Sequence, residues 1–321
     1  MNRFLTRLLA ACTLMLTAAG LGAQPYPSRP VRVVVPYPAG QGTDLVTRYV
    51  AEQLSRGMGQ NFVVDNRPGA AGNIGTQAVA RAPADGYTLL MGTNGTHAAA
   101  PFLFASPGFD PLADFEPVAL IGILPLAIVT GPGNPVDSVD KLIAAAKARP
   151  DAINVAFTTT TSRATLELFK QKAGAPLFGV AYKGSAQAIS DLIGGQVEYM
   201  VDTIASLRTT VAAGKLKALA VTSATSGELM PGVRSVAEQG VRGYELTGWN
   251  VLYAPKGTPA EVVRVLAGEV SKVMALPDTR QKLLQLGVEP QTATGAELAR
   301  FVVAERDKWG GVIRAANIRV D

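Results

Sequence analysis

A nine-residue stretch of small and polar residues, Pro36-Tyr37-Pro38-Ala39-Gly40-Gln41-Gly42-Thr43-Asp44, constrains the fold of this chain most. The five residues before it, VRVVV at 31–35, are typical of a strand buried in a parallel sheet. After it, apolar residues recur at helical spacing, with Thr43 or Asp44 placed to cap the first turn. The small residues leave the helix N–H groups facing an opening, and this arrangement predicts an anion site.

The same order of strand, small polar loop and helix recurs along the chain. Strands are expected at 62–65, 87–91, 153–157, 178–182, 197–201 and 216–222. Helices are expected at 138–148, 163–173, 186–193, 204–213, 260–275, 278–286 and 296–316. This alternation predicts α/β units with parallel strands and right-handed crossovers. Ligands of such sheets bind beyond the carboxyl ends of the strands, so the polar loops should face a cleft.

Two stretches look like crossings between domains. A long apolar run at 118–130 is broken by Gly122 and Pro125, and a strand expected at 244–254 returns the chain. We therefore expect a first domain built from both chain ends, residues 24–123 and 249–321, and a second domain at residues 124–248.

The first 23 residues resemble a secretory signal peptide. Arg3 and Arg7 precede an apolar run at 8–19, and Leu21-Gly22-Ala23 forms a small-residue cleavage site. Its removal would lower Lys+Arg from 30 to 28 against 25 Asp+Glu, and the net charge from +5 to +3. A charge this small is no footprint of nucleic-acid binding. The signal-like segment therefore predicts a secreted protein.

Cys12, the one cysteine of the chain, lies inside this signal. The mature chain is thus expected to have no disulfide, thiol nucleophile or thiolate metal site. Residues 9–12 also resemble a lipoprotein cleavage box, but the four residues between Arg7 and Cys12 are too few for an apolar region of about 7 to 15 residues. We expect secretion without a lipid anchor.

The sequence contains no convincing motif for nucleotide binding or for catalysis. Gly40-Gln41-Gly42-Thr43-Asp44-Leu45 begins like a dinucleotide fingerprint, but leucine occupies the third glycine position and no P-loop lysine follows. The alternative, that these glycines only make a tight turn, stays open. His97, the single histidine, has no nucleophile elbow nearby, so we interpret it as a hydrogen-bonding loop residue. The scattered aspartates predict no metal site.

Loops of the second domain could face the same cleft. Hydroxyl groups at Thr158-Thr159-Thr160-Thr161-Ser162 precede a helix and could donate to a ligand together with its N–H groups. Arg163 could be a solvated first-turn side chain or the partner of a carboxylate. Asp202 is interpreted as a helix cap, with a ligand-facing role as the alternative.

Several motifs carry a family resemblance that covers the mature chain. They are Tyr26-Pro27-Ser28-Arg29-Pro30, Pro38–Asp44, Val64-Asp65-Asn66-Arg67-Pro68-Gly69-Ala70-Ala71-Gly72-Asn73-Ile74-Gly75, Ala84-Asp85-Gly86-Tyr87-Thr88-Leu89, Asp114–Val118, Asp191–Glu198, and Pro255-Lys256-Gly257-Thr258-Pro259. With these motifs the chain resembles the Bug family of periplasmic solute receptors, the substrate-binding proteins of tripartite tricarboxylate transporters.

The resemblance implies an α/β, two-lobed periplasmic-binding fold of type II, each lobe a mainly parallel sheet flanked by helices, with the ligand cleft between them. It implies a receptor that binds a small carboxylate or amino acid without transforming it and hands it to membrane permease subunits. A sensor kinase as the recipient, and a periplasmic hydrolase that uses His97, are the alternatives. We expect a monomer, no cofactor and no metal.

The ligand site implied by this family takes backbone amides and hydroxyls from both lobes. The candidate residues are Tyr37, Pro38, Ala39, Gly40, Gly42, Thr43, Asp44, Thr93, Asn94, Gly95, Thr96, Thr159, Thr160, Ser162, Arg163, Gly184, Ser185 and Asp202. Where many relatives have a small residue and a histidine after the glycine-serine loop, this chain has Arg163, which could alter the charge or size of the ligand.

Overall fold

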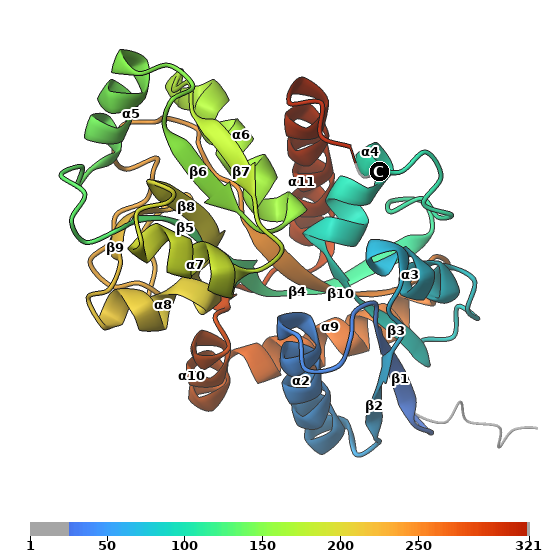
Figure 1. Cartoon of the computed structure of the whole chain (residues 1–321). Helices are drawn as coiled ribbons and strands as arrows, with labels where there is room; N and C mark the ends of the chain where they lie inside the picture. The colour runs from blue at the N-terminus through green and yellow to red at the C-terminus, as the bar shows by residue number, and fades with distance from the viewer. Residues whose placement is uncertain (1–25, 320–321) are drawn as a thin grey trace, which may run out of the picture.

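The structure, a computed structural model, describes residues 26–319 and consists of two lobes joined by crossing strands (Figure 1). The expected signal peptide at 1–23, with Cys12, lies outside the described residues. No helix within the described range combines the length and apolarity needed to cross a membrane.

Lobe 1 is built on a six-stranded sheet with the order β11-β4-β10-β3-β1-β2. Its strands are β1 (Val31–Val35), β2 (Phe62–Asn66), β3 (Thr88–Thr93), β4 (Phe115–Leu124), β10 (Gly248–Pro255) and β11 (Glu289–Pro290). Its helices are α2 (Gly42–Met58), α3 (Asn73–Ala80), α4 (Ala100–Leu103), α9 (Ala260–Met274), α10 (Pro277–Gln285) and α11 (Gly295–Ala315), with short turns η2 (Ala70–Gly72) and η3 (Gly95–Ala99).

Lobe 2 is built on a five-stranded sheet with the order β7-β6-β8-β5-β9. Its strands are β5 (Leu126–Thr130), β6 (Asn154–Phe157), β7 (Phe178–Ala181), β8 (Tyr199–Thr203) and β9 (Lys217–Val221). Its helices are α5 (Val139–Ala148), α6 (Thr160–Ala173), α7 (Ser185–Ile193) and α8 (Ile204–Ala212). The two-lobed α/β class expected from the sequence is therefore confirmed.

Both sheets are mixed, whereas the sequence predicted mainly parallel ones. β1 pairs in parallel with β2 and β3, and β6 with β7 and β8. The strands by which the chain enters a sheet from the other lobe run the other way: β10 is antiparallel to β3 and β4, and β5 is antiparallel to β8 and β9. A strand that arrives from the other lobe must enter its sheet at the facing edge, so it runs opposite to the strands that end there.

The crossings lie where Pro125 and the 240–247 connector separate the two sheets. The chain leaves the first sheet at Leu124 and enters the second at Leu126, and it returns to the first at Gly248. We propose that the two domains have the limits expected above, residues 24–123 with 249–321 and residues 124–248.

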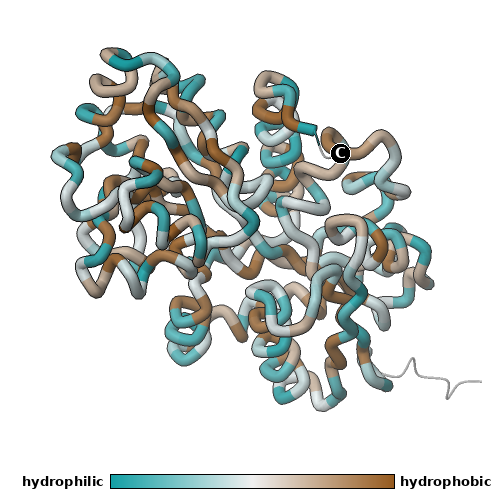
Figure 2. The backbone as a smooth tube through the Cα atoms, in the orientation of Figure 1, coloured by the Kyte–Doolittle hydropathy of each residue, from teal (hydrophilic) through white to brown (hydrophobic). Residues whose placement is uncertain are grey.

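Apolar side chains fill the space between sheets and helices. On one face of the first sheet, α2 and α9 bury Val46, Val50 and Leu266 against the strands. On the other face, Trp309 of α11 belongs to a buried cluster that continues into lobe 2. Figure 1 shows α11 standing between α4 and α6, and Figure 2 shows hydrophobic segments mainly inside the lobes. Helix α11 thus packs against both lobes.

A partly buried polar network fixes α11 to the strand by which the chain returns to lobe 1. The indole N–H of Trp249 donates to the Glu305 carboxylate over 3.0 Å. The Lys308 ammonium lies 2.5 Å from Glu305 and 2.9 Å from Glu245, which belongs to the connector before β10. The network therefore joins the connector, β10 and the long C-terminal helix.

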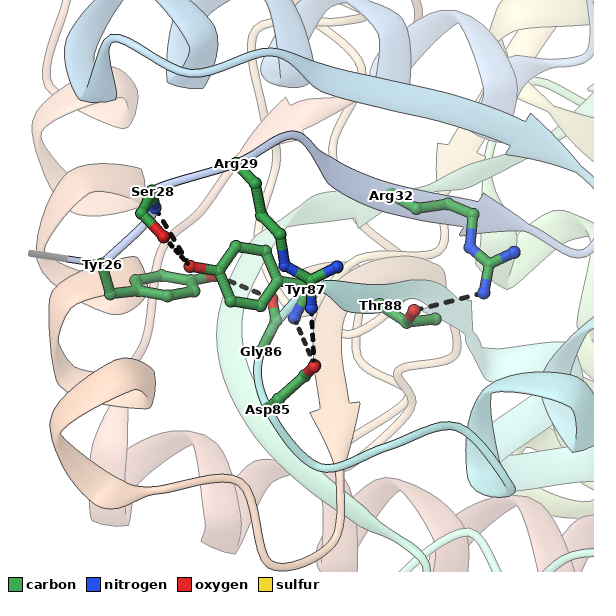
Figure 3. Close-up of polar contacts among 8 residues, drawn as sticks. All are labelled: Tyr26, Ser28, Arg29, Arg32, Asp85, Gly86, Tyr87 and Thr88. Atoms are coloured by element: carbon green, nitrogen blue, oxygen red, sulfur yellow. Dashed lines mark hydrogen bonds and ion pairs between the residues drawn. The ribbon is translucent and has the colours of Figure 1, made fainter. Parts of the chain in front are cut away.

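Two of the motifs that carried the family resemblance contact each other at the edge of lobe 1 remote from the crossings (Figure 3). The hydroxyl of Tyr26 donates to the Gly86 carbonyl over 2.7 Å, and the N–H of Ser28 donates to the Tyr87 hydroxyl over 3.0 Å. Arg29 pairs with Asp85 at 2.9 Å and covers the Tyr87 ring at 4.0 Å. These motifs anchor the start of the described chain to the loop before β3.

Candidate functional site

A cavity of about 430 Å³ opens between the lobes at the sheet edges that face each other. This volume falls within the roughly 300 to 1,000 Å³ of small-molecule sites. Lobe 1 and lobe 2 both supply its wall, which consists of Tyr37, Gln41, Gly42, Thr43, Thr93, Asn94, Gly95, Leu124, Leu126, Thr159, Thr161, Thr203, Ala205, Ser206, Gly248, Leu286 and Gly287. Among the described residues, no Asp, Glu, Lys or Arg side chain belongs to this wall.

The N-terminus of α2 forms one side of the cavity. Gln41 is the N-cap, and the first helical hydrogen bond runs from the N–H of Leu45 to the Gln41 carbonyl at 3.0 Å. The N–H groups of Gly42, Thr43 and Asp44 precede that bond, so the helix itself gives them no acceptor. The first two of these residues line the cavity. The site therefore receives backbone donors and the positive end of a 17-residue helix.

Asp44 faces away from the cavity, and its role differs from the predicted helix cap. It is the third residue of α2, 1% exposed, and its carboxylate accepts from the Gly40 N–H at 2.8 Å, Arg48 Nε at 3.0 Å and Asn66 Nδ2 at 2.9 Å. Burial raises the pKa of this carboxyl, but the hydrogen bonds outweigh burial and the pKa lies below its ordinary value. The Gly40 N–H is thus bonded within the loop rather than offered to a ligand.

Of the other residues in the loop before α2, one lines the cavity and three lie on the surface. Tyr37 lines the cavity, and its hydroxyl bonds the Thr93 hydroxyl at 2.8 Å. Burial raises the pKa of Tyr37, so the phenol is neutral near pH 7. Pro38, Ala39 and Gly40 are exposed and lie outside the wall.

The loop after β3 contributes a second part of the lobe 1 wall. Thr93, Asn94 and Gly95 line the cavity, whereas Thr96 is buried behind them. The Thr96 hydroxyl bonds His97 Nδ1 at 2.9 Å and accepts from the Thr93 N–H at 3.1 Å. Thr96 therefore supports the shape of this loop from within.

His97 is a buried core residue. The sequence predicted a hydrogen-bonding loop residue; the hydrogen bond is present, but the burial was not predicted. Its ring is 2% exposed, stacks on Tyr253 at 4.0 Å between ring centroids and meets Phe115 at 4.8 Å. Burial lowers its pKa to about 3, so the imidazole is neutral at physiological pH. It does not belong to the cavity wall, and a hydrolase built on His97 has no geometry here to support it.

The N-terminus of α6 faces the cavity from lobe 2. The sequence placed the start of this helix at Arg163, but the helix begins at Thr160, because Thr159 and Ser162 form a capping box. The Thr159 hydroxyl accepts from the Ser162 N–H at 3.1 Å, and the Ser162 hydroxyl accepts from the Thr159 N–H at 2.9 Å. Thr159 and Thr161 line the cavity, whereas Thr160, Ser162 and Arg163 do not.

Asp202 holds lobe 2 loops together rather than facing the cavity. Its buried carboxylate accepts from the Thr158 hydroxyl at 3.2 Å, the Ser185 hydroxyl at 2.5 Å and the Thr203 N–H at 2.7 Å. Thr203, not Asp202, caps α8, with its hydroxyl 3.4 Å from the Ser206 N–H. Gly184, the N-cap of α7, and Ser185 also lie outside the wall.

Several residues of the cavity wall were not predicted from the sequence. The N-terminus of α8 supplies Thr203, Ala205 and Ser206, and the rule that ligands bind beyond strand ends could have found them after β8. Gln41 and Thr161 lie within stretches that were singled out, but neither was among the candidate ligand-binding residues. Leu124, Leu126, Gly248, Leu286 and Gly287 come from the crossings and from the turn after α10, and no local sequence signal marks them.

The described residues contain no group of three or more His, Cys, Asp or Glu side chains that could hold a metal ion. The polar groups that this wall offers to a ligand are therefore hydroxyls, amides, backbone N–H groups and the positive ends of α2, α6 and α8. Such groups recognise an anion or a polar ligand, and none of them in this wall is placed as a nucleophile beside a base.

This combination of two lobes, crossing strands and a donor-rich cavity between them defines a solute-binding protein fold. Residues 46–318 match the family described as tripartite tricarboxylate transporter family receptor, and the chain belongs to that family. The resemblance to the Bug family is thereby confirmed.

Individual relatives cover nearly the whole chain. Protein BugT of Bordetella pertussis is 35% identical over 323 residues, which span 98% of this chain and 99% of that protein. The solved structure of R. palustris Rpa4515 with adipate is 36% identical, with a TM-score of 0.76 and coverage of 92% and 100%. MatC from Rhodopseudomonas palustris with bound malate is 31% identical, with a TM-score of 0.70 and coverage of 90% and 100%.

Proposed function

We propose that this chain is a periplasmic receptor that captures a small carboxylate in the cavity between its lobes and delivers it, unchanged, to the membrane permease of a tripartite tricarboxylate transporter. The observation that carries this proposal is the convergence of three helix N-termini, those of α2, α6 and α8, on a wall without charged side chains.

The energetics of this wall favour an anion. Each helix N-terminus contributes about 0.3 to 2 kcal/mol to binding of a nearby negative charge. The N–H groups of Gly42 and Thr43 and hydroxyls such as those of Thr43 and Ser206 can donate without a permanent counter-charge that would have to be desolvated. Relatives of similar sequence were solved with adipate and with malate, both dicarboxylates. These observations support a carboxylate as the ligand.

The apolar residues of the wall bear on the rest of the ligand. Leu124, Leu126 and Leu286 lie in the same cavity as the three N-termini. A carboxylate with a short hydrocarbon chain can place its charge at the helix ends and its methylene groups against these leucines. Each buried methylene contributes about 0.8 kcal/mol.

The family and the N-terminal sequence support the proposed location and partners. The signal-like residues 1–23 support export to the periplasm, and membership of the receptor family supports a permease as the recipient. We infer that the chain acts as a binding protein rather than as an enzyme.

A melting-temperature panel tests the proposal. Purified protein is heated with adipate, malate, citrate, benzoate and aspartate, and with the neutral diamide of adipate as the control. At about 100 times its dissociation constant a ligand adds about 2.7 kcal/mol of stability, which raises the melting temperature by several degrees. At least one carboxylate should give such a shift and the diamide none. No shift with any carboxylate, or an equal shift with the diamide, would refute the proposal.

A further inference from the structure

One side of the cavity is closed by a direct contact between the lobes. Ala205, in the first turn of α8, and Gly287, in the turn after α10, both belong to the wall. A Cβ atom placed on Gly287 would lie 2.6 Å from the Ala205 Cβ and 3.2 Å from its Cα. The two backbones therefore meet without room for another methyl group. This contact between the lobes therefore closes the cavity on one side.

Arg208 holds this contact from the lobe 2 side. It lies one turn after Ala205 on α8 and is half-buried. Its Nη1 donates to the Leu284 carbonyl at 2.9 Å, and its Nη2 donates to the Gln285 carbonyl at 2.5 Å. These carbonyls belong to the last turn of α10, where the helix dipole favours a cation. The Leu284 carbonyl also accepts from the Gly287 N–H at 3.0 Å.

The bonds of Arg208 act on residues that line the cavity. Leu286 and Gly287 follow directly after the two carbonyls that Arg208 binds. The Leu284 side chain packs against the apolar cluster of lobe 2. The last turn of α10 thus belongs in sequence to lobe 1 but is held by lobe 2.

Two further contacts hold residues 280–289, the segment that contains the last turn of α10, against lobe 2. The Glu289 carboxylate accepts from the N–H groups of Glu228 at 3.2 Å and Leu229 at 3.4 Å. Arg280 pairs with Glu228, but both side chains are about half exposed, and an exposed pair contributes only about 0 to 1 kcal/mol. Of the two arginines, only Arg208 reaches the residues beside the cavity.

We propose that Arg208 is a positioning residue for ligand binding: it fixes the C-terminus of α10 against α8 and thereby sets the spacing of the lobes at the Ala205–Gly287 wall. The ligand part of this role rests on the proposed function above. The spacing itself can be measured without any ligand.

The first measurement is the distance between spin labels on the two lobes. Cys12 is the one cysteine of the chain, so Cys12→Ser provides a background for labels at Arg56→Cys on α2 and Lys147→Cys on α5, both exposed positions. Pulsed dipolar spectroscopy on the ligand-free protein should give a longer and broader distance distribution in Arg208→Ala than in the labelled parent. Arg208→Lys, which can donate to one carbonyl, should restore part of the change, and Arg280→Ala should leave the parental distribution.

A second variant keeps the test decisive should Arg208→Ala fail to fold. Gly287→Ala places a Cβ atom 2.6 Å from the Ala205 Cβ, so it should also lengthen the distance. Gly214→Ala makes the same change just after α8, also at a positive φ but with nothing within 4 Å of the new Cβ, and should not. Parental distributions in both Arg208→Ala and Gly287→Ala, with cooperative unfolding retained, would overturn the proposal.

Titration with adipate and with malate forms the second arm. We expect roughly tenfold weaker binding in Arg208→Ala, as for the loss of charge-assisted hydrogen bonds, with partial recovery in Arg208→Lys. Changed distances with parental affinity would overturn the ligand part of the proposal. If the distances change in Arg208→Ala but the parent protein binds no carboxylate, the proposed function is refuted. The role of Arg208 in setting the spacing of the lobes would then still hold.

Discussion

The side-chain amide of Asn94 donates to the hydroxyl of Thr161 over 3.2 Å and so joins lobe 1 to lobe 2 within the cavity wall. Asn94 follows β3 and is only 7% exposed, and Thr161 is the second residue of α6. A ligand between α2 and α6 therefore meets a wall whose two halves are already hydrogen-bonded to each other.

Replacement of Asn94 by aspartate tests the charge preference of the wall. The change keeps the shape of the side chain but places a negative charge beside the bound carboxylate, and like charges at an interface cost several kcal/mol. We expect Asn94→Asp to weaken carboxylate binding more than about tenfold in titration calorimetry. Asn61→Asp, the same change at an exposed position before β2, should bind like the parent. Unchanged affinity in Asn94→Asp would contradict an anion site at this wall.

Asp44 should stabilise the loop before α2 through its ionised form. Asp44→Asn removes a charged acceptor from three donors, which should lower the free energy of unfolding at pH 7 by about 1 to 3 kcal/mol. Because the pKa of Asp44 is lower in the folded state, its contribution is present above the unfolded pKa of about 3.9 and is lost as the pH falls through the folded value. Urea unfolding at several pH values checks this, and a variant as stable as the parent at pH 7 would argue against it.

His97 should also make stability depend on pH, and its replacement should leave ligand binding unchanged. Its folded pKa of about 3 lies below the ordinary 6.5, so the unfolded chain binds a proton that the folded chain does not. Between these values stability should fall by about 1.4 kcal/mol for each unit of decreasing pH. His97→Phe should remove this slope between pH 6 and pH 4.

The comparison of slopes isolates His97, because burial raises the pKa of Glu305 in both proteins alike. Carboxylate affinity at pH 7 should be the same in His97→Phe and the parent, since the ring lies outside the wall. An identical pH dependence of unfolding in the two proteins would show that His97 is not buried as a neutral ring.

The two lobes and the loop before α2 could be predicted from the sequence because their signals are local. The buried strand at 31–35, the glycine-containing loop and the helix after it are contiguous, and all three are present as β1, the loop and α2. The same holds for the threonine stretch before α6. Mixed sheets escaped prediction because strand direction depends on where the chain crosses between lobes, which no window of residues contains.

The individual wall residues were harder to predict for a physical reason. Within one loop, neighbouring residues point in different directions, so Thr159 and Thr161 line the cavity while Thr160 does not. Asp44, Asp202 and Ser185 look like ligand-binding groups in sequence, but each finds partners inside its own lobe. Leu286 and Gly287 reach the cavity only through the packing of α10 against α8, a contact between residues far apart in the chain.

The central claim is that the cavity between α2, α6 and α8 holds the carboxylate, and Gly42→Leu tests it most directly. A Cβ atom on Gly42 would meet nothing within 4 Å, and its backbone needs no positive φ, so a leucine there fills the cavity at little cost to stability. Gly268→Leu, on the exposed face of α9, is the matched control.

The measurement is calorimetric titration of the two variants and the parent with the carboxylate that most raises the melting temperature of the parent. The account predicts that Gly42→Leu binds more than about tenfold more weakly, a loss of at least about 1.4 kcal/mol, while Gly268→Leu binds like the parent and all three unfold at similar temperatures. Parental affinity in Gly42→Leu would contradict it.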